Sequence, residues 1–155
     1  MSGEQAILLA EDDENDVFLL RRALERAGLP AELIVAHDGA EAVDYLSRGG
    51  SAATRGRAPL PGLFLLDLKM PRLSGFDVLA WLAQQKRLKD LPVVVLSSSA
   101  HEGDMERARL LGAKDYRVKP ADFLNLVELM KDLYARWLSG SGPPESASPR
   151  APVSG

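Results

Sequence analysis

Residues 63–67 read Leu-Phe-Leu-Leu-Asp, four apolar residues followed directly by a carboxylate. A run of this kind, without polar alternation, is typical of a strand that a parallel sheet buries on both faces. Four further short runs rich in apolar residues occur at 6–10, 33–36, 93–96 and 116–118. We therefore expect five strands, with the run at 63–66 third in chain order.

Stretches with apolar residues at helical spacing lie between these runs. In the first, Val17, Leu20, Leu24 and Ala27 recur at intervals of three and four residues, and Gly28 follows as a stop signal. The remaining helices are expected at residues 39–48, 74–89, 102–112 and 122–138. This alternation predicts a three-layer, doubly wound α/β fold with a parallel sheet, in which ligands bind beyond the carboxyl ends of the strands.

The composition is that of an ordinary globular protein, with 46% apolar and 26% charged residues in a chain of 155. This length corresponds to about one domain, and no run approaches the roughly 18 apolar residues of a membrane span. A net charge of −3 does not indicate a nucleic-acid partner, and the lack of cysteine excludes disulfides, thiolate zinc sites and cysteine nucleophiles. The polar N-terminus has no secretory signal, so we expect a cytoplasmic protein that does not enter a membrane.

Two segments fall outside the alternation of strands and helices. Residues 48–62 form a loop punctuated by Gly and Pro, whose three arginines we interpret as solvated, because the loop lies at the end of the sheet away from the ligand site. Residues 139–155 include twelve Gly, Pro or Ser residues among seventeen, a composition too polar to pack. We expect one domain at residues 5–138, followed by a disordered tail at 139–155.

Polar side chains stand directly after four of the expected strands. Glu11 and Asp12 follow the first strand, Asp67 the third, Ser97 the fourth and Lys119 the fifth. Because parallel strands end at one rim, these groups should meet in one pocket. Crowded carboxylates repel one another unless a cation binds, and oxygen ligands without His or Cys favour Mg²⁺ or another hard ion.

Each of these features alone has an ordinary structural explanation. An acidic run before a helix favours the helix dipole, and serine-rich turns and Lys-Pro pairs are common in loops. Their occurrence together at the strand ends of one sheet indicates a functional site.

Five separated stretches carry a pattern of known order and spacing. They are residues 7–13, 65–71 with Ser74-Gly75 following, 92–97, 112–113 and 115–120. In these stretches the chain resembles the receiver domains of two-component response regulators, and the resemblance covers residues 5–138. It implies a flavodoxin-like receiver fold with the strand order 2-1-3-4-5.

The resemblance also implies roles for the carboxylates. Asp67 would be the phosphoacceptor, a nucleophile that takes a phosphoryl group from the phosphohistidine of a sensor kinase. Mg²⁺ would lie between Asp12, Asp67, the backbone carbonyl of Lys69 and the phosphoryl oxygens, with Glu11 acting mainly through water. Such a transfer depends mostly on positioning and charge neutralisation.

Three further residues take roles from the resemblance. Lys119 would pair with the phosphoryl group, and its neighbour Pro120 would follow a cis peptide bond. Ser97, where Thr is the commoner residue, would donate a hydrogen bond to a phosphoryl oxygen, and Tyr116 would then swing inward behind it.

The resemblance implies a stand-alone switch, not an enzyme beyond its own Mg²⁺-dependent phosphorylation and dephosphorylation, because no output domain is recognisable after the last helix. Its partners would be a sensor histidine kinase and a downstream target or phosphotransfer protein. The long loop at 48–62 is similar to that of regulators of phytochrome-type kinases. On helical wheels Leu110 and Leu124 point away from the core, which favours a homodimer, and Phe18 points to solvent on the first helix.

Other functions remain open from the residues alone. A phosphatase could use an Asp nucleophile on a similar α/β fold, but such enzymes generally have a second acid two residues later, where this chain has Lys69. A flavin or small-molecule carrier would need a Gly-, Ser- or Thr-rich phosphate cradle in place of the acidic first loop. A scaffold without phosphorylation is disfavoured because every expected polar position is filled.

Overall fold

The sheet has the predicted number and order of strands. The computed structural model describes residues 5–48 and 60–139, and in them five parallel strands lie in the spatial order β2-β1-β3-β4-β5. The strands are β1 (Gln5–Ala10), β2 (Ala31–Ala36), β3 (Leu63–Leu66), β4 (Val93–Ser97) and β5 (Asp115–Val118). Each predicted run lies inside an observed strand, so the α/β fold and the strand order are confirmed.

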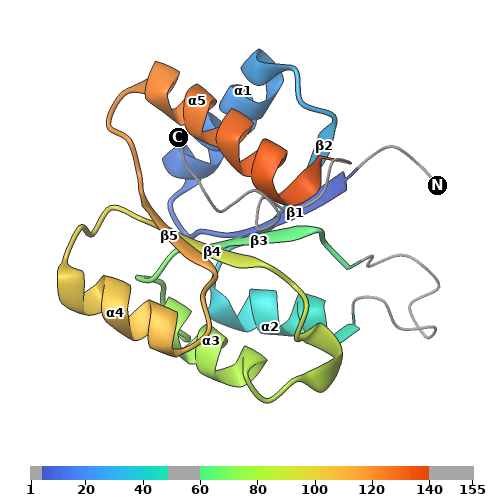
Figure 1. The fold of residues 1–155 in the computed structure, drawn as a ribbon, viewed down its shortest axis with the longest axis vertical. Coiled ribbons are helices and arrows are strands. Elements are labelled where there is room, and N and C mark those ends of the chain that lie inside the picture. The colour runs from blue at the N-terminus through green and yellow to red at the C-terminus, as the bar shows by residue number, and fades with distance from the viewer. Residues whose placement is uncertain (1–4, 49–59, 140–155) are drawn as a thin grey trace.

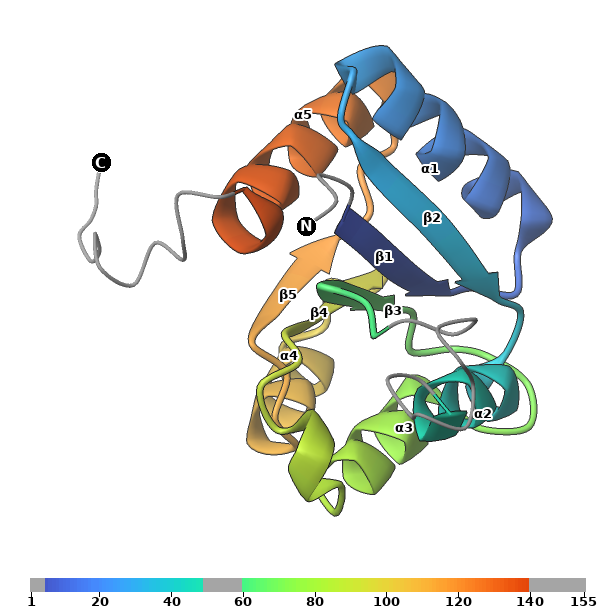
Figure 2. The same cartoon turned by 90° about the vertical axis from the view of Figure 1, so that its right-hand side faces the viewer.

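Helices cover both faces of this sheet. Figure 1 and Figure 2 show α1 and α5 packed on one face, and α2, α3 and α4 on the other. The helices are α1 (Glu14–Ala27), α2 (Gly39–Arg48), α3 (Gly75–Leu82), α4 (Glu102–Leu110) and α5 (Phe123–Leu133). A π-helical turn at Tyr134–Leu138 continues α5, so the chain stays helical through most of the predicted range 122–138.

Burial on two faces explains the apolar run at residues 63–66. Leu65 belongs to the core between the sheet and α1 and α5, whereas Phe64 and Leu66 belong to the core under the other three helices. All three side chains are fully buried. Because successive side chains of a strand point to opposite faces, both faces of β3 must be apolar.

The prediction of a single helix at residues 74–89 is wrong for its second half. α3 ends at Leu82, and a separate 3₁₀ turn follows at Lys86–Leu88. The backbone N–H of Ala83 still bonds four residues back, to Leu79, whereas those of Gln84 and Gln85 bond to carbonyls three residues back, and Gln85 has an extended backbone. This tightening ends the α-helix before the apolar pattern ends.

Some expectations concern parts of the chain outside the described residues. They include most of the loop expected at 48–62 and all of the expected tail after Ser139. Among the helices that the structure describes, none combines the length and the apolar character needed to cross a membrane.

Candidate functional site

The parallel register sets two carboxylates side by side at the rim of the sheet. Ala10 of β1 pairs with Leu66 of β3, and the next residues of the two strands are Glu11 and Asp67. The backbone N–H of Asp67 donates to the carbonyl of Ala10 at 3.1 Å, which continues the ladder one residue beyond the strand. The position of these two side chains therefore follows from the strand register.

Three carboxylates form a cluster at this rim. One oxygen from each of Glu11, Asp12 and Asp67 lies within 4.8 Å of the other two. Glu11 and Asp67 are buried, with exposed fractions of 3% and 7%, whereas Asp12 is exposed. Convergent carboxylate oxygens fit a hard divalent cation, because such ions take oxygen ligands and offset the repulsion among the acids.

The electrostatics of Asp67 reflect this crowding. Burial raises the pKa of its carboxyl above the ordinary value of 3.8, and the charge of Asp12 raises it further. The charge of Lys119 lowers the pKa of Asp67, and so do the nearby backbone N–H groups of Leu68 and Lys69. A bound cation would favour the ionised form, which is the nucleophilic one.

Lys119 lies among three carboxylates, and it is closer to Glu11 and Asp16 than to Asp67. Its Nζ is 2.7 Å from Oε1 of Glu11, 2.8 Å from Oδ2 of Asp16 and 3.8 Å from Oδ1 of Asp67. Asp16, in the first turn of α1, is not among the residues expected at the strand ends, and its place in the acidic run at 11–16 is the only sequence signal that points to it. The peptide bond before Pro120 is trans, so the expected cis bond is wrong; trans is the lower-energy form of such bonds by about 0.5–1 kcal/mol.

Ser97 at the end of β4 and Tyr116 on β5 both hydrogen-bond to Ser99, in the loop between β4 and α4. The Ser97 hydroxyl is buried at the end of β4 and accepts a hydrogen bond from the backbone N–H of Ser99 at 3.1 Å. The half-buried Tyr116 donates its phenolic hydroxyl to the carbonyl of Ser99 at 2.8 Å. The loop between β4 and α4 thus links the two residues expected to act as the switch.

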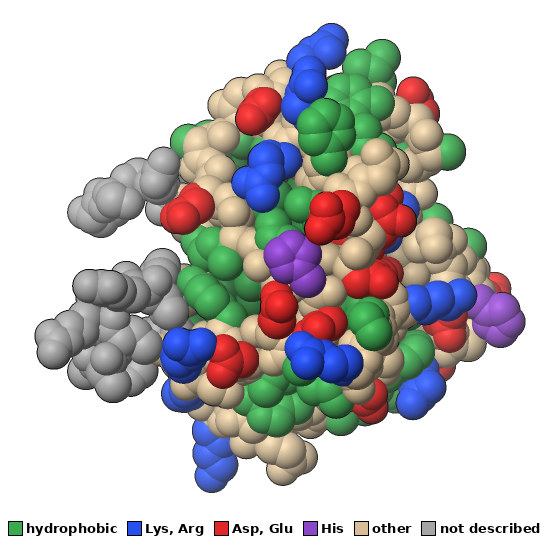
Figure 3. Space-filling view, turned by 180° about the vertical axis from the view of Figure 1, so that it is seen from behind, with side chains coloured by type: hydrophobic (Ala, Val, Ile, Leu, Met, Phe, Trp, Pro, Cys, Tyr) green, Lys and Arg blue, Asp and Glu red, His purple; other side chains and the backbone are tan. Residues whose placement is uncertain are grey.

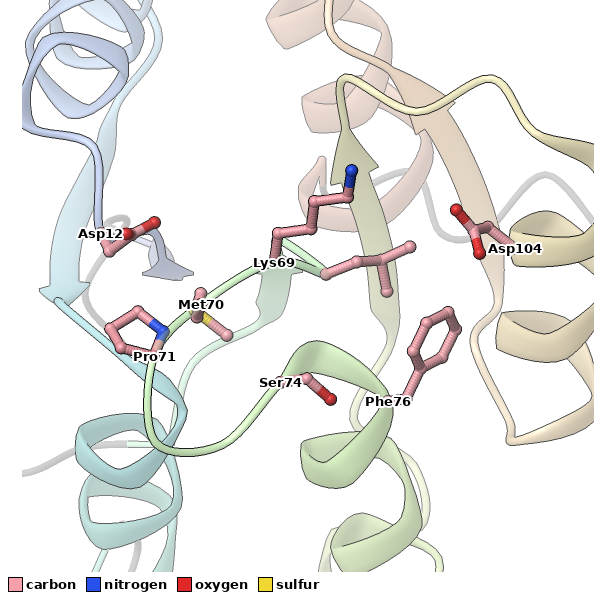
Figure 4. A pocket seen from close by; sticks show the side chains of 8 residues that line it. Asp12, Lys69, Met70, Pro71, Ser74, Phe76 and Asp104 are labelled. Carbon is pink, nitrogen blue, oxygen red and sulfur yellow. The ribbon is translucent and has the colours of Figure 1, made fainter.

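Lys69 is exposed on the loop between β3 and α3, beside an open groove of about 460 Å³. Figure 4 shows Asp12 on one side of this groove and Phe76 and Asp104 on the other. Acidic side chains gather near the middle of the molecular face seen in Figure 3, with Lys and Arg around them. An anionic donor that enters here meets carboxylates, so a bound cation would aid its approach.

Known proteins of one family are similar to this chain. The model of the response regulator receiver domain matches residues 7–131. FilR2, a probable methanogenesis regulatory protein of Methanothrix harundinacea, is 37% identical over 142 residues, which cover 88% of each chain. The response regulator Rcp1 of Synechocystis sp. is 34% identical over 134 residues, 86% of this chain and 89% of Rcp1.

Solved structures agree with these sequence similarities. The phosphorylated cyanobacterial phytochrome response regulator RcpA superposes with a TM-score of 0.77 at 37% identity, covering 88% of this chain and 95% of RcpA. The Mn²⁺-bound form of Rcp1 superposes with a TM-score of 0.75 at 33% identity, covering 88% and 96%. The phosphatase alternative gains no support from any of these similarities.

Proposed function

Because the chain belongs to the response regulator receiver domain family, we propose that it is a phosphorylation switch in which Asp67 accepts a phosphoryl group from a sensor histidine kinase. The carboxylate cluster of Glu11, Asp12 and Asp67, with Lys119 beside it, is the observation that carries this proposal. In the transfer, one Asp67 oxygen forms a bond to phosphorus while the P–N bond of the phosphohistidine breaks. The imidazole nitrogen leaves with the electron pair.

Mg²⁺ is the cation that we propose for this cluster. Asp12 and Asp67 would hold it directly together with the carbonyl of Lys69, and Glu11 would act through water. When bound, the ion neutralises negative charge on the transferring group. The family's use of divalent ions supports this assignment, as does the Mn²⁺-bound form of the relative Rcp1.

The other polar residues of the rim stabilise the product. Lys119 would leave its present contacts with Glu11 and Asp16 in part and pair with the new phosphoryl oxygens, to which its charge is complementary. Ser97 would donate its hydroxyl to one of these oxygens. Tyr116 already packs on the core and donates to the Ser99 carbonyl, so phosphorylation would stabilise this inward position and with it the surface near β5.

The signal would be passed on by contacts of a cytoplasmic domain at residues 5–138. On this proposal the chain is no enzyme toward other molecules and catalyses only its own phosphorylation and dephosphorylation. The similarity to RcpA, a phytochrome response regulator, favours a phytochrome-type kinase as the donor. A downstream protein or phosphotransfer protein would receive the signal, and the chain would act as a homodimer.

Incubation with Mg²⁺ and acetyl phosphate, followed by intact mass measurement, tests this function. We expect the mass of one phosphoryl group to be added, and Asp67→Asn to abolish the addition without loss of the fold. An adduct that survives in Asp67→Asn would refute the assignment of Asp67. Release of phosphate from a phosphate ester in large excess over the protein would instead favour the phosphatase.

A further inference from the structure

The loop between β3 and α3, residues 67–74, determines how the phosphoacceptor is oriented. The end of this loop packs directly on the phosphoacceptor, since a Cβ atom on Gly75 would lie only 2.4 Å from the backbone carbonyl oxygen of Asp67. The carbonyl of Leu68 in turn accepts from the N–H of Gly75 at 2.9 Å. A shift of this loop would therefore move the backbone of Asp67 and with it the reactive carboxylate.

The far end of the loop contains a strained residue. The N–H of Leu73 donates to the carbonyl of Pro71 at 2.8 Å, a bond across two residues that closes a γ-turn. Arg72 lies at the centre of this turn with φ of 70°, a value that side chains other than glycine's rarely adopt. Something outside the loop must hold Arg72 in this conformation.

An ion pair with the start of α2 supplies that contact. Nε and Nη2 of Arg72 lie 2.9 Å and 2.8 Å from Oδ2 of Asp38. The other carboxylate oxygen of Asp38 accepts from the backbone N–H of Glu41 at 2.8 Å and so caps α2. The Asp38 side chain is only 12% exposed, although that of Arg72 is 61% exposed. Asp38 is therefore a fixed anchor for the guanidinium.

A close backbone approach strengthens the same junction. A Cβ atom on Gly39 would lie only 2.2 Å from the carbonyl oxygen of Leu73, so the loop rests directly on the first residue of α2. The loop end and the helix start are thus packed as one unit, with the ion pair of Asp38 and Arg72 at its side.

We propose that the ion pair between Asp38 and Arg72 is a positioning contact, which holds the β3–α3 loop in the conformation that orients the Asp67 carboxylate for metal and phosphoryl donor. This role rests on the proposed function, since it concerns the affinity and reactivity of that same site. Neither Asp38 nor Arg72 belongs to the carboxylate cluster that would hold the cation.

A purely electrostatic effect and a positioning role predict different changes in cation affinity when Asp38 or Arg72 is substituted. Loss of the negative charge of Asp38 would weaken cation binding through space, whereas loss of the positive charge of Arg72 would strengthen it. Loss of a positioning contact weakens binding in both cases. Asp38→Asn retains a good helix cap, and Arg72→Gly removes the backbone strain at φ of 70°, so both variants should fold.

The test is a titration with Mn²⁺, followed by electron paramagnetic resonance of the free ion. We expect Asp38→Asn and Arg72→Gly each to raise the Kd for Mn²⁺ by about three- to tenfold, and the double variant to be no weaker than the weaker single one. Amide hydrogen exchange at Leu68 and Lys69, measured without metal, should become faster in both. The matched control is Asp44→Asn, which breaks an exposed ion pair with Arg48 within α2 and should leave the Kd unchanged.

Three results would overturn the positioning role. They are an unchanged or stronger affinity in Arg72→Gly, additive losses in the double variant, and an equal loss in the Asp44→Asn control. If the unsubstituted chain neither bound Mn²⁺ nor gained a phosphoryl group, the proposed function itself would fail. The unsubstituted chain is therefore measured first, which separates the two failures.

Discussion

Nζ of Lys119 lies 2.7 Å from Oε1 of Glu11, and this contact ties the chain after β5 to the end of β1. Burial raises the pKa of Glu11 to about 7, and nearby Asp67 adds to the rise while Lys119 opposes it. The pKa of Lys119 is raised despite its burial, because the hydrogen bonds to Asp16 and Glu11 favour its charged form. Lys119 is thus charged at neutral pH, whereas Glu11 changes its protonation state close to pH 7.

The raised pKa of Glu11 predicts a pH dependence of stability in the metal-free protein. Between its ordinary pKa of 4.5 and its folded value of about 7, the folded state binds more protons than the unfolded state. The contribution of Glu11 to the free energy of unfolding therefore falls as pH rises through this window. Urea unfolding at pH 5 and pH 8 should show that the free energy of unfolding falls less with rising pH in Glu11→Gln than in the unsubstituted chain. An equal fall in both would show that Glu11 is not the group responsible.

Metal binding should depend on Asp12, the exposed member of the carboxylate cluster. A hard dication needs convergent carboxylates, so Asp12→Ala should weaken Mg²⁺ binding by about tenfold or more, as measured by calorimetric titration. Asp13→Ala is the control, because Asp13 caps α1 through the N–H groups of Asn15 and Asp16 and lies outside the cluster. Unchanged affinity in Asp12→Ala would mean that another set of ligands operates.

The sequence was sufficient to predict those parts of the site that backbone register determines. Glu11 and Asp67 follow paired residues of adjacent parallel strands, so their proximity needs only the strand order and the position of each strand end. The end of α3 was not predictable in this way, since apolar spacing continues past Leu82 to the buried Leu88 while the backbone does not stay helical.

Contacts between long side chains that are far apart in the chain could not be predicted from the sequence. Lys119 and Asp16 are 103 residues apart in the chain, and Arg72 and Asp38 are 34 apart. Each pair depends on rotamers and on the path of a loop, for which the spacing of apolar residues contains no information. The unusual φ of Arg72 is hidden in the same way, because neither Gly nor Asn marks the turn.

The central strand should be sensitive to loss of side-chain volume. Leu65 is fully buried on β3, and Leu65→Ala removes apolar contacts and leaves a cavity, so the free energy of unfolding should fall by about 2–5 kcal/mol. Urea unfolding measures this loss. The control is Leu60→Ala, at a position 42% exposed, which should stay within about 0.5 kcal/mol of the parent. Similar losses in both variants would contradict the burial of Leu65.

Homodimer formation should depend on two exposed leucines. Leu110 on α4 and Leu124 on α5 have exposed fractions of 76% and 56%, as their helical-wheel positions predicted. If they form part of an interface, light scattering should give a dimer mass for the phosphorylated chain and a monomer mass for the double variant Leu110→Ser, Leu124→Ser. A monomer at high concentration, with and without acetyl phosphate, would exclude the homodimer.

Phe18 is the residue on which we expect recognition of the kinase to depend. It lies on α1 near the carboxylate rim and is 54% exposed, in agreement with its predicted outward direction. The guanidinium of Arg22 lies 5.7 Å from the centre of its ring, so an aromatic and a cationic group stand together on the helix surface. Aromatic and arginine side chains are the types that most often dominate protein interfaces.

A comparison of two phosphoryl donors distinguishes a role of Phe18 in kinase docking from a role in the packing of α1. Phe18→Ala should slow transfer from the cognate kinase by about tenfold, while labelling by acetyl phosphate stays unchanged, because the small donor needs the rim and not the helix. Leu60→Ala serves as the control for loss of an exposed apolar side chain and should affect neither reaction. Equal slowing of both reactions in Phe18→Ala would indicate damaged packing of α1. Unchanged rates with both donors would show that the kinase does not use this side chain.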